Sequence, residues 1–245
     1  MAETCTVYWA PVFIEATQNW NMIYPDLTSV HERIRPYKTS TKSGNFFYCP
    51  SFTGLAENTF VLENPIAGSY KIVNNQVGAH DETFINAWTE HASSMEGYNM
   101  LSYGMKWVFF TEEDIEMMLV SPFFGNAEHL KYGNVMPGKL NISKWFRYIN
   151  LEYILHKGVK EFKVNKGESL AYVVFNTNKK VNLKRFEMND KMFELLAQAR
   201  NQPVDVVKAA PYGSAMLTPA QLATYTKLVV QECAKITKEH FGVEE

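Results

Sequence analysis

The stretch from Lys144 to Phe186 constrains the fold more than any other part of the sequence, because its apolar residues recur at every second position. Side chains of a β-strand alternate between two faces, so this spacing predicts strands that bury one face. Lys157-Gly158 and Asn165-Lys166-Gly167-Glu168 separate the runs, and glycine favours the tight turns that join strands. Leu170 to Phe175 is apolar on both faces, which indicates a central strand. We therefore predict four strands in an antiparallel meander.

Two further apolar runs, Met105–Phe110 and Ile115–Val120, lie upstream and are separated by Thr111-Glu112-Glu113-Asp114. This separator admits two interpretations. A helix could begin at Thr111, because threonine is a good N-cap and acidic residues suit a first turn. We favour a hairpin of two strands. The stretch from Pro25 to Pro50 is predicted to be irregular.

The composition changes near residue 188, where Ala, Leu, Lys, Gln and Glu begin to dominate. Thr218-Pro219-Ala220-Gln221 is a capping box with proline at the first helical position, and it predicts a helix that runs to about His240. The apolar side chains of this helix form one narrow stripe. The stripe packs on the β-rich part of the chain, or it binds another chain by docking in a groove or by self-association.

These patterns predict an α+β, β-rich fold, with an antiparallel β-sandwich or jelly-roll-like core and C-terminal helices. Residues 1–188 are predicted to form the β-rich core domain. Residues 189–245 are predicted to form a helical segment that packs on the core or is used for assembly, and the helix over residues 219–240 is the expected site of a protein partner or of self-association.

Charge and motifs exclude several classes of partner. The formal net charge is −2 and no run of basic residues stands out, so a nucleic acid partner is not expected. No apolar run approaches the roughly 18 residues of a spanning helix, so no membrane partner is expected. Three scattered cysteines suit a reducing compartment. No GxSxG, dinucleotide fingerprint or HExxH helix is present, and no cofactor is predicted.

One candidate ligand site combines aromatic and cationic side chains. Trp145 and Arg147 are close in sequence, and Trp107 adds a third group. Such side chains could stack on a base, a sugar or a peptide. The alternative is a set of core aromatic residues with an arginine at the edge.

A candidate metal site lies at His80, Asp81 and His91, in the densest group of possible ligands. Imidazole and carboxylate groups bind transition metals, but these residues would need a loop to converge. The alternative is a solvated loop that leads into a helix. Cys49 has no histidine nearby in the sequence, so we predict a buried structural cysteine rather than a nucleophile.

Several stretches of residues 7–187 resemble an uncharacterised family of proteins of tailed bacteriophages of marine bacteria, which has no assigned activity. The stretches that carry the resemblance are Trp9-Ala-Pro11, Asn45-Phe-Phe-Tyr-Cys-Pro50, Asn58-Thr-Phe-Val-Leu-Glu-Asn-Pro65, Ser121-Pro-Phe-Phe124, Trp145-Phe-Arg147 and Glu161-Phe-Lys-Val-Asn-Lys-Gly-Glu168. The resemblance implies a phage origin. A weaker likeness, from Phe162 to Phe175, is to the strands of β-barrel nucleotide hydrolases of the dUTPase kind, and it implies a fold analogy alone.

From these observations we expect a non-enzymatic phage protein, either a virion component or a binder of a host or phage protein. The alternative is a small-molecule enzyme or ligand-binding protein on a jelly-roll-like scaffold. The expected location is the cytoplasm of the infected host cell, or the virion.

Overall fold

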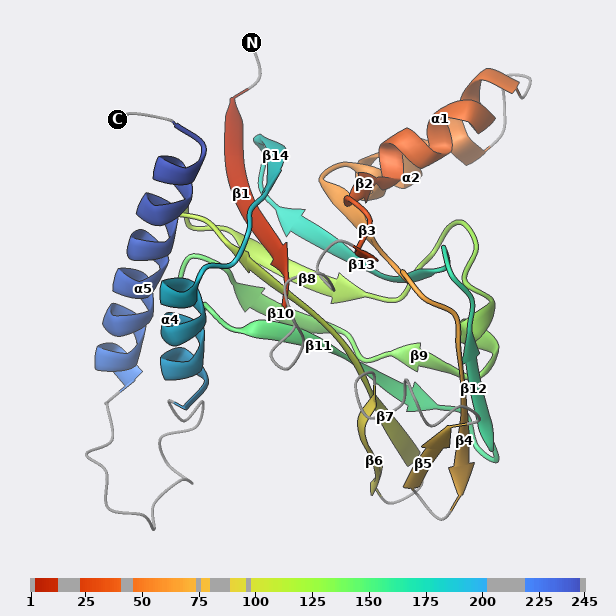
Figure 1. Ribbon diagram of the computed structural model, residues 1–245. Helices are drawn as coiled ribbons and strands as arrows, with labels where there is room; N and C mark the ends of the chain where they lie inside the picture. The colour runs from red at the N-terminus through yellow and green to blue at the C-terminus, as the bar shows by residue number, and fades with distance from the viewer. Residues whose placement is uncertain are drawn as a thin grey trace.

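The computed structural model describes residues 3–12, 23–40, 46–73, 76–79, 89–95, 98–201 and 219–242. In this part of the chain, two large β-sheets face each other, a smaller sheet closes one end, and helices lie on both outer sides (Figure 1). This architecture confirms the predicted α+β, β-rich class with a sandwich core and C-terminal helices.

Sheet A has six strands and combines the first strand of the chain with the last. Its order is β14-β1-β7-β11-β9, and β6 also pairs with β7. The β1–β14 pair is parallel and the other pairs are antiparallel. The strands are β1 (Thr4–Pro11), β6 (Thr89–Met95), β7 (Tyr98–Phe110), β9 (Gly133–Val135), β11 (Tyr148–Leu155) and β14 (Lys180–Arg185).

Sheet B has five antiparallel strands in the order β10-β8-β13-β3-β2. They are β2 (Thr28–Ser29), β3 (Thr59–Glu63), β8 (Glu116–Val120), β10 (Gly138–Asn141) and β13 (Ser169–Asn176). Sheet C is antiparallel and consists of β12 (Glu161–Val164), β4 (Gly68–Val73) and β5 (Gln76–Ala79).

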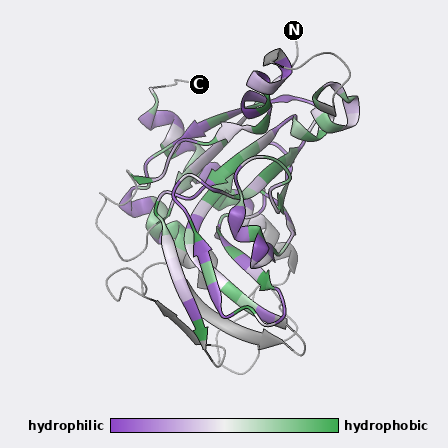
Figure 2. Ribbon diagram, turned by 90° about the vertical axis from the view of Figure 1, so that its right-hand side faces the viewer, coloured by the Kyte–Doolittle hydropathy of each residue, from purple (hydrophilic) through white to green (hydrophobic). Residues whose placement is uncertain are grey.

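Three apolar cores join these layers, and alternate residues of one strand face different cores, as the strand period requires. The central core lies between sheets A, B and C and receives Trp9 and Val173. The helix-side core lies between sheet A and the C-terminal helices and receives Tyr8. The outer core lies between sheet B and the first helices and receives Tyr172. Figure 2 shows the apolar residues, in green, running along the strands of the sandwich.

The helices lie in two groups. The first group, α1, η2 and α2, lies over sheet B, and the second, α4 and α5, lies beside sheet A (Figure 1). A short 3₁₀ turn, η3, precedes β9. The bounds are α1 (Val30–Ser40), η2 (Phe46–Tyr48), α2 (Pro50–Ala56), η3 (Glu128–Lys131), α4 (Asp190–Asn201) and α5 (Pro219–His240). Among the described residues, no helix is both long enough and apolar enough to cross a bilayer.

The predicted C-terminal helix is confirmed, and its apolar side is occupied within the same chain. Val229 and Cys233, two members of the predicted stripe, are at most 3% exposed and lie in the helix-side core. Asn189 caps α4, because its Oδ1 accepts a hydrogen bond from the backbone N–H of Met192 at 2.9 Å. The division into residues 1–188 and 189–245 stays a prediction.

The predicted meander is wrong, although all four of its strands exist. β11 pairs with β7 and β9, β12 pairs with β4, β13 pairs with β3 and β8, and β14 pairs with β1. The turn at Gly167 is confirmed, with φ of +82°, and so is the turn at Gly158, with φ of +83°. The turns therefore pass the chain from one sheet to another instead of folding it into hairpins.

The predicted hairpin over residues 105–120 is correct in its strands and wrong in its pairing. β7 belongs to sheet A and β8 belongs to sheet B. Residues 111–115 form the corner between the two sheets. There the backbone carbonyl of Ile142 accepts the N–H of Thr111 at 3.4 Å, and the Thr111 hydroxyl donates to the carbonyl of Thr6 at 2.8 Å.

The stretch from Pro25 to Pro50 is not irregular, because it contains α1. This helix forms even though Pro36 lies inside it. A proline removes one backbone hydrogen bond, but Val30 and Ile34, one helical turn apart, are both 0% exposed in the outer core. Their burial stabilises the helix against that loss.

Candidate functional site

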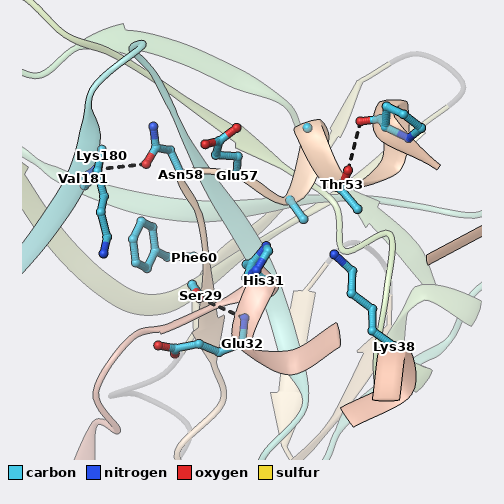
Figure 3. A pocket seen from close by; sticks show the side chains of 13 residues that line it. Ser29, His31, Glu32, Lys38, Thr53, Glu57, Asn58, Phe60, Lys180 and Val181 are labelled. Atoms are coloured by element: carbon cyan, nitrogen blue, oxygen red, sulfur yellow. Dashed lines mark hydrogen bonds between the residues drawn. The ribbon is translucent and has the colours of Figure 1, made fainter. Parts of the chain in front are cut away.

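An open cleft with a volume of about 800 Å³ lies between the α1–α2 pair and the strands β3 and β14 (Figure 3). The cleft therefore lies where the first helices meet one end of sheet A and one side of sheet B. Its lining comes from β2, α1, α2, the turn after α2, β3 and β14: Ser29, His31, Glu32, Lys38, Pro50, Thr53, Gly54, Ala56, Glu57, Asn58, Phe60, Lys180 and Val181.

The start of α1 gives the cleft its first wall. Ser29 Oγ accepts the backbone N–H of Glu32 at 3.1 Å, which satisfies one of the free donors at the helix start. His31 and Lys38 are seven residues apart, so they lie on the same side of the helix. Both residues line the cleft.

Arg33 fixes α1 to the sandwich. Its Nε donates to Thr28 Oγ1 at 2.9 Å and its NH1 donates to Ser169 Oγ at 3.3 Å, while NH2 forms an ion pair with Glu63. A guanidinium group presents several donors in a fixed plane, so this one side chain connects α1 with β2, β3 and β13. The first wall of the cleft is thereby held on sheet B.

The second wall is α2, which begins with Pro50 at its first helical turn. Thr53 lines the cleft, and its hydroxyl lies 3.2 Å from the backbone carbonyls of both Cys49 and Pro50, to which it can donate. Gly54 lies in this helix although nothing requires a glycine there, since a Cβ would meet no atom within 4 Å. Glycine costs a helix about 1 kcal/mol relative to alanine, and here it leaves backbone open to the cleft.

Asn58 lines the cleft, and it is the one non-glycine residue with a positive φ, +50°, in the described part of the chain. Its Nδ2 donates to the carbonyls of Thr177 at 3.2 Å and Lys179 at 2.8 Å. Its Oδ1 accepts the N–H of Val181 at 3.0 Å. Asparagine tolerates the left-handed region, and these bonds offset the remaining strain. They place the start of β14 against β3.

The charged side chains of the cleft are of both signs. Five ionisable residues line it without an ion-pair or side-chain hydrogen-bond partner among the described residues, namely His31, Glu32, Lys38, Glu57 and Lys180. The two lysines balance the two glutamates. In the view of Figure 3, Lys38 and Lys180 lie on opposite sides with His31 between them, and Phe60 lies beside Lys180. The cleft can therefore bind both charged ends of a ligand around an apolar part.

The structure does not bring the three predicted stacking residues together at a surface. Trp107 is 1% exposed in the central core, with its ring 5.5 Å from that of Tyr24. Trp107 is therefore a core aromatic residue and not part of an exposed stacking site. Arg147 lies over the ring of Trp145 at 5.2 Å, and burial lowers the pKa of its guanidinium. Both of these residues are half-buried.

The predicted metal ligands fall largely outside the described residues. His80 and Asp81 lie outside them, and His91 is described only through its backbone, in β6. Among the residues whose side chains are described, no group of three or more His, Cys, Asp or Glu could hold a metal ion.

Cys49 is exposed, so the prediction that it is buried is wrong. It precedes α2, and hydrogen bonds from the backbone N–H groups of Phe52 and Ser51 lower the pKa of its thiol. Cys5 and Cys233 are the buried cysteines. A residue at the N-cap position of a surface helix stays accessible because the helix begins beyond it.

A buried ionisable pair, His129 and Glu168, was missed by sequence reasoning. Both side chains are 0% exposed, and His129 Nδ1 lies 2.8 Å from Glu168 Oε2. Burial lowers the pKa of His129. Burial alone would raise the pKa of Glu168, but hydrogen bonds from His129 and Asn165 outweigh it and lower that pKa. His129 is therefore neutral and donates to an ionised carboxylate.

The His129–Glu168 pair is closed to ligands, and its role is structural. Glu168 also accepts the backbone N–H of His129 at 3.1 Å and that of Asn165 at 3.1 Å. The carboxylate thus joins η3 to the turn before β13. The His129 ring packs on the rings of Tyr153 and Phe162.

The cleft itself was also missed, although one local signal for it exists. Ser29 is followed three positions later by Glu32, the spacing of a capping box, and this marks the start of α1. Pro25, Pro36 and Pro50 instead favour an irregular stretch, because proline disrupts the hydrogen bonds of a helix interior. The approach of β14 to α2 has no local signal, because it depends on pairing between distant segments.

No known protein family matches the chain, and no curated protein matches it.

Proposed function

We propose that this is a binding protein that holds its ligand in the cleft between α1, α2, β3 and β14. The observation that carries the proposal is the cleft of about 800 Å³ with five ionisable side chains that have no partner among the described residues. Ligand sites of proteins usually occupy about 300–1,000 Å³ and place a few polar groups around apolar walls. The proposal develops the ligand-binding alternative of the sequence analysis.

The construction of the cleft also supports this proposal. Arg33 and Asn58 tie its walls to the sandwich with seven hydrogen bonds or ion pairs between them, so the walls need little ordering when a ligand binds. Gly54 adds open space in the wall of α2. A site on fixed elements holds a ligand more precisely than one on loops.

Substitution of Gly54 tests the proposal. Gly54→Trp is expected to fill the cleft without a clash, because a Cβ at this position meets no atom within 4 Å. The matched control is Gly138→Trp on β10, where a Cβ also meets nothing. β10 lies at the far edge of sheet B from β2 and β3. Neither Gly54 nor Gly138 has a positive φ, so the backbone at both positions can accept another residue.

The measurement is a thermal-shift screen of the wild type with nucleotides, sugars, 2-oxoacids and short peptides. We expect at least one class to raise the Tm of the wild type and of Gly138→Trp, and to leave the Tm of Gly54→Trp unchanged. A ligand that stabilises all three proteins equally binds outside the cleft and contradicts the proposal. So does a screen in which nothing raises the Tm.

The phage origin and the role as a virion component stay predictions from the sequence. Mass spectrometry of purified phage particles tests the virion role, and absence of the protein from the particles contradicts it. A binder of a host or phage protein would be found inside the infected cell instead.

A further inference from the structure

We infer that the ligand of the cleft is an extended polypeptide segment that carries side chains of both charge signs around an apolar residue. This inference rests on the proposed function and names the class of ligand. Its three supports are the length of the cleft, the arrangement of its charges and the exposed apolar side chains on the helices that form it.

The cleft is elongated along α1. His31 and Lys38 both line it and are seven residues apart, which is roughly 10 Å along a helix at 1.5 Å per residue. An extended chain rises about 3.3 Å per residue, so about three residues of a peptide match this length. On the other wall, Pro50, Thr53 and Glu57 follow helical spacing along α2 and its end. The cleft is thus bordered along its length by one side of α1 and one side of α2, with β3 and β14 completing it.

The charges of the cleft suit a ligand of mixed charge. Two glutamates, Glu32 and Glu57, line the cleft with the two lysines, and Lys38 and Lys180 lie at opposite sides of the view in Figure 3. A nucleotide or another strongly anionic ligand would meet the carboxylates of Glu32 and Glu57 as well as the lysines, and like charges oppose binding. A polypeptide can place an acidic side chain at each lysine and a basic one between the glutamates.

The apolar part of the cleft provides the remaining contact. Phe60, Val181 and Pro50 line it, and Gly54 leaves backbone accessible beside them. An apolar side chain of the ligand can bury itself on Phe60, whose ring also packs on Phe175 at 5.8 Å. Anchors of this kind supply most of the binding energy in peptide complexes.

The helices that form the cleft also carry exposed apolar side chains. Tyr37, Tyr48 and Leu55 are each 49% exposed, and they are three of the six large apolar residues that are exposed in the described part of the chain. Tyr37 precedes Lys38, and the Tyr48 hydroxyl donates to the carbonyl of Lys38. These exposed side chains could add apolar contacts for a polypeptide that is longer than the cleft, whereas a small metabolite held inside the cleft would not use them.

A random library of twelve-residue peptides, panned on the full-length protein, tests the inference. Enriched peptides are then synthesised, and their Kd values for the wild type and its variants are measured by fluorescence polarisation. We expect enriched peptides to contain an acidic and a basic residue around an aromatic or aliphatic one. Gly54→Trp should weaken them more than tenfold, while the control Gly138→Trp should bind as the wild type does.

Charge reversal provides a second measurement that needs no bulky substitution. Lys38→Glu and Lys180→Glu change exposed or half-buried side chains without a partner among the described residues, so folding is expected to be unaffected. Each should weaken a peptide by on the order of fivefold, the range of an accessible ion pair. Replacing the acidic residue of the peptide by lysine should restore its binding to the reversed variant.

The failure of the inference is distinguishable from that of the proposed function. Peptides that bind Gly54→Trp as tightly as the wild type overturn the inference. A different result is that no peptide is enriched but ATP or inorganic phosphate raises the Tm of the wild type and not that of Gly54→Trp. The ligand of the cleft is then an anion, which overturns the inference and leaves the proposed function standing. If no probe gives a cleft-dependent effect, both fall.

Discussion

At the scale of single residues, His129 and Glu168 are the buried groups whose protonation affects folding most directly. A neutral imidazole donates to an ionised carboxylate at 2.8 Å, and both side chains are 0% exposed. Protonation of either one places an additional proton in a closed, aromatic environment. The pair therefore makes the stability of the fold depend on pH.

The direction of this dependence follows from the two lowered pKa values. A group whose pKa is lower in the folded than in the unfolded state contributes stability that is present above the unfolded pKa and is lost as the pH falls. The unfolded pKa of histidine is about 6.5 and that of glutamate about 4.3. The contribution of His129 to the free energy of unfolding should therefore be lost as the pH falls below about 6.5. The contribution of Glu168 should be lost as the pH falls below about 4.3.

Substitution of His129 tests the first of these two steps. The wild type should lose free energy of unfolding between pH 7.5 and pH 5.5, by about 1.4 kcal/mol for each pH unit in which the unfolded state alone is protonated. His129→Gln should have a lower free energy of unfolding than the wild type at pH 7.5. Between pH 7.5 and pH 5.5 it should lose less of that free energy than the wild type does. The control is His240→Gln, at an exposed position. Urea unfolding at each pH measures the effect, and equal pH slopes for wild type and His129→Gln would contradict it.

At the scale of elements, β13 is the central strand of sheet B, as its sequence predicts. Its two faces are unequal, however. Val173 is 0% exposed in the central core, whereas Val174 is half-buried on the side of the outer core. The sequence predicts a strand with two apolar faces, but alternation within an all-apolar run does not show which face is better covered.

Two substitutions in β13 compare these faces. Val173→Asp should lower the free energy of unfolding by about 4 kcal/mol or more, because it buries an unpaired carboxylate. Val174→Asp should cost about 1–2 kcal/mol, because its carboxylate can reach water. Urea denaturation of both variants checks the ranking. A Val174→Asp protein as unstable as Val173→Asp would show that the outer core seals this side as well.

The elements also show which parts of the fold the sequence predicts. Period two in β11 is local, and Ile149, Leu151, Tyr153 and Leu155 are all buried as expected. Pairing is not local: Thr4 lies opposite Lys180, and no pattern within either strand specifies the other. The cleft depends on such pairing, because β14 brings Lys180 to α2. The prediction therefore found strands, turns and the last helix, and missed the site.

At the scale of the whole molecule, the helices on the two sides of the sandwich differ in role. α1 and α2 leave a cleft between themselves and the strands, whereas α4 and α5 cover the side of sheet A that faces them. Lys238 of α5 also forms an ion pair with Glu112, in the corner between β7 and β8, at 2.7 Å. This side of α5 is thus a contact with the β-rich part. A protein partner would have to use the opposite side.

Two substitutions in α5 separate these sides. Val230 is 1% exposed in the helix-side core, and Leu228, two positions earlier, is 59% exposed. Val230→Asp should lower the free energy of unfolding by several kcal/mol, and a chain of this size loses roughly 2–4 °C in Tm for each kcal/mol. Leu228→Asp should leave the Tm within about one degree, because its side chain already contacts water.

Light scattering on the same two variants, and on a chain without residues 218–245, decides how α5 is used. If α5 serves the fold, the shortened chain exposes the helix-side core and loses stability or aggregates, and Leu228→Asp keeps the mass of the wild type. If α5 also assembles copies of the chain, Leu228→Asp lowers the mass at unchanged Tm, because the outward side alone is altered. A shortened chain that keeps both the Tm and the mass of the wild type would contradict both uses of α5. Removal of Val230 and its neighbours from the helix-side core would then have no effect on the free energy of unfolding.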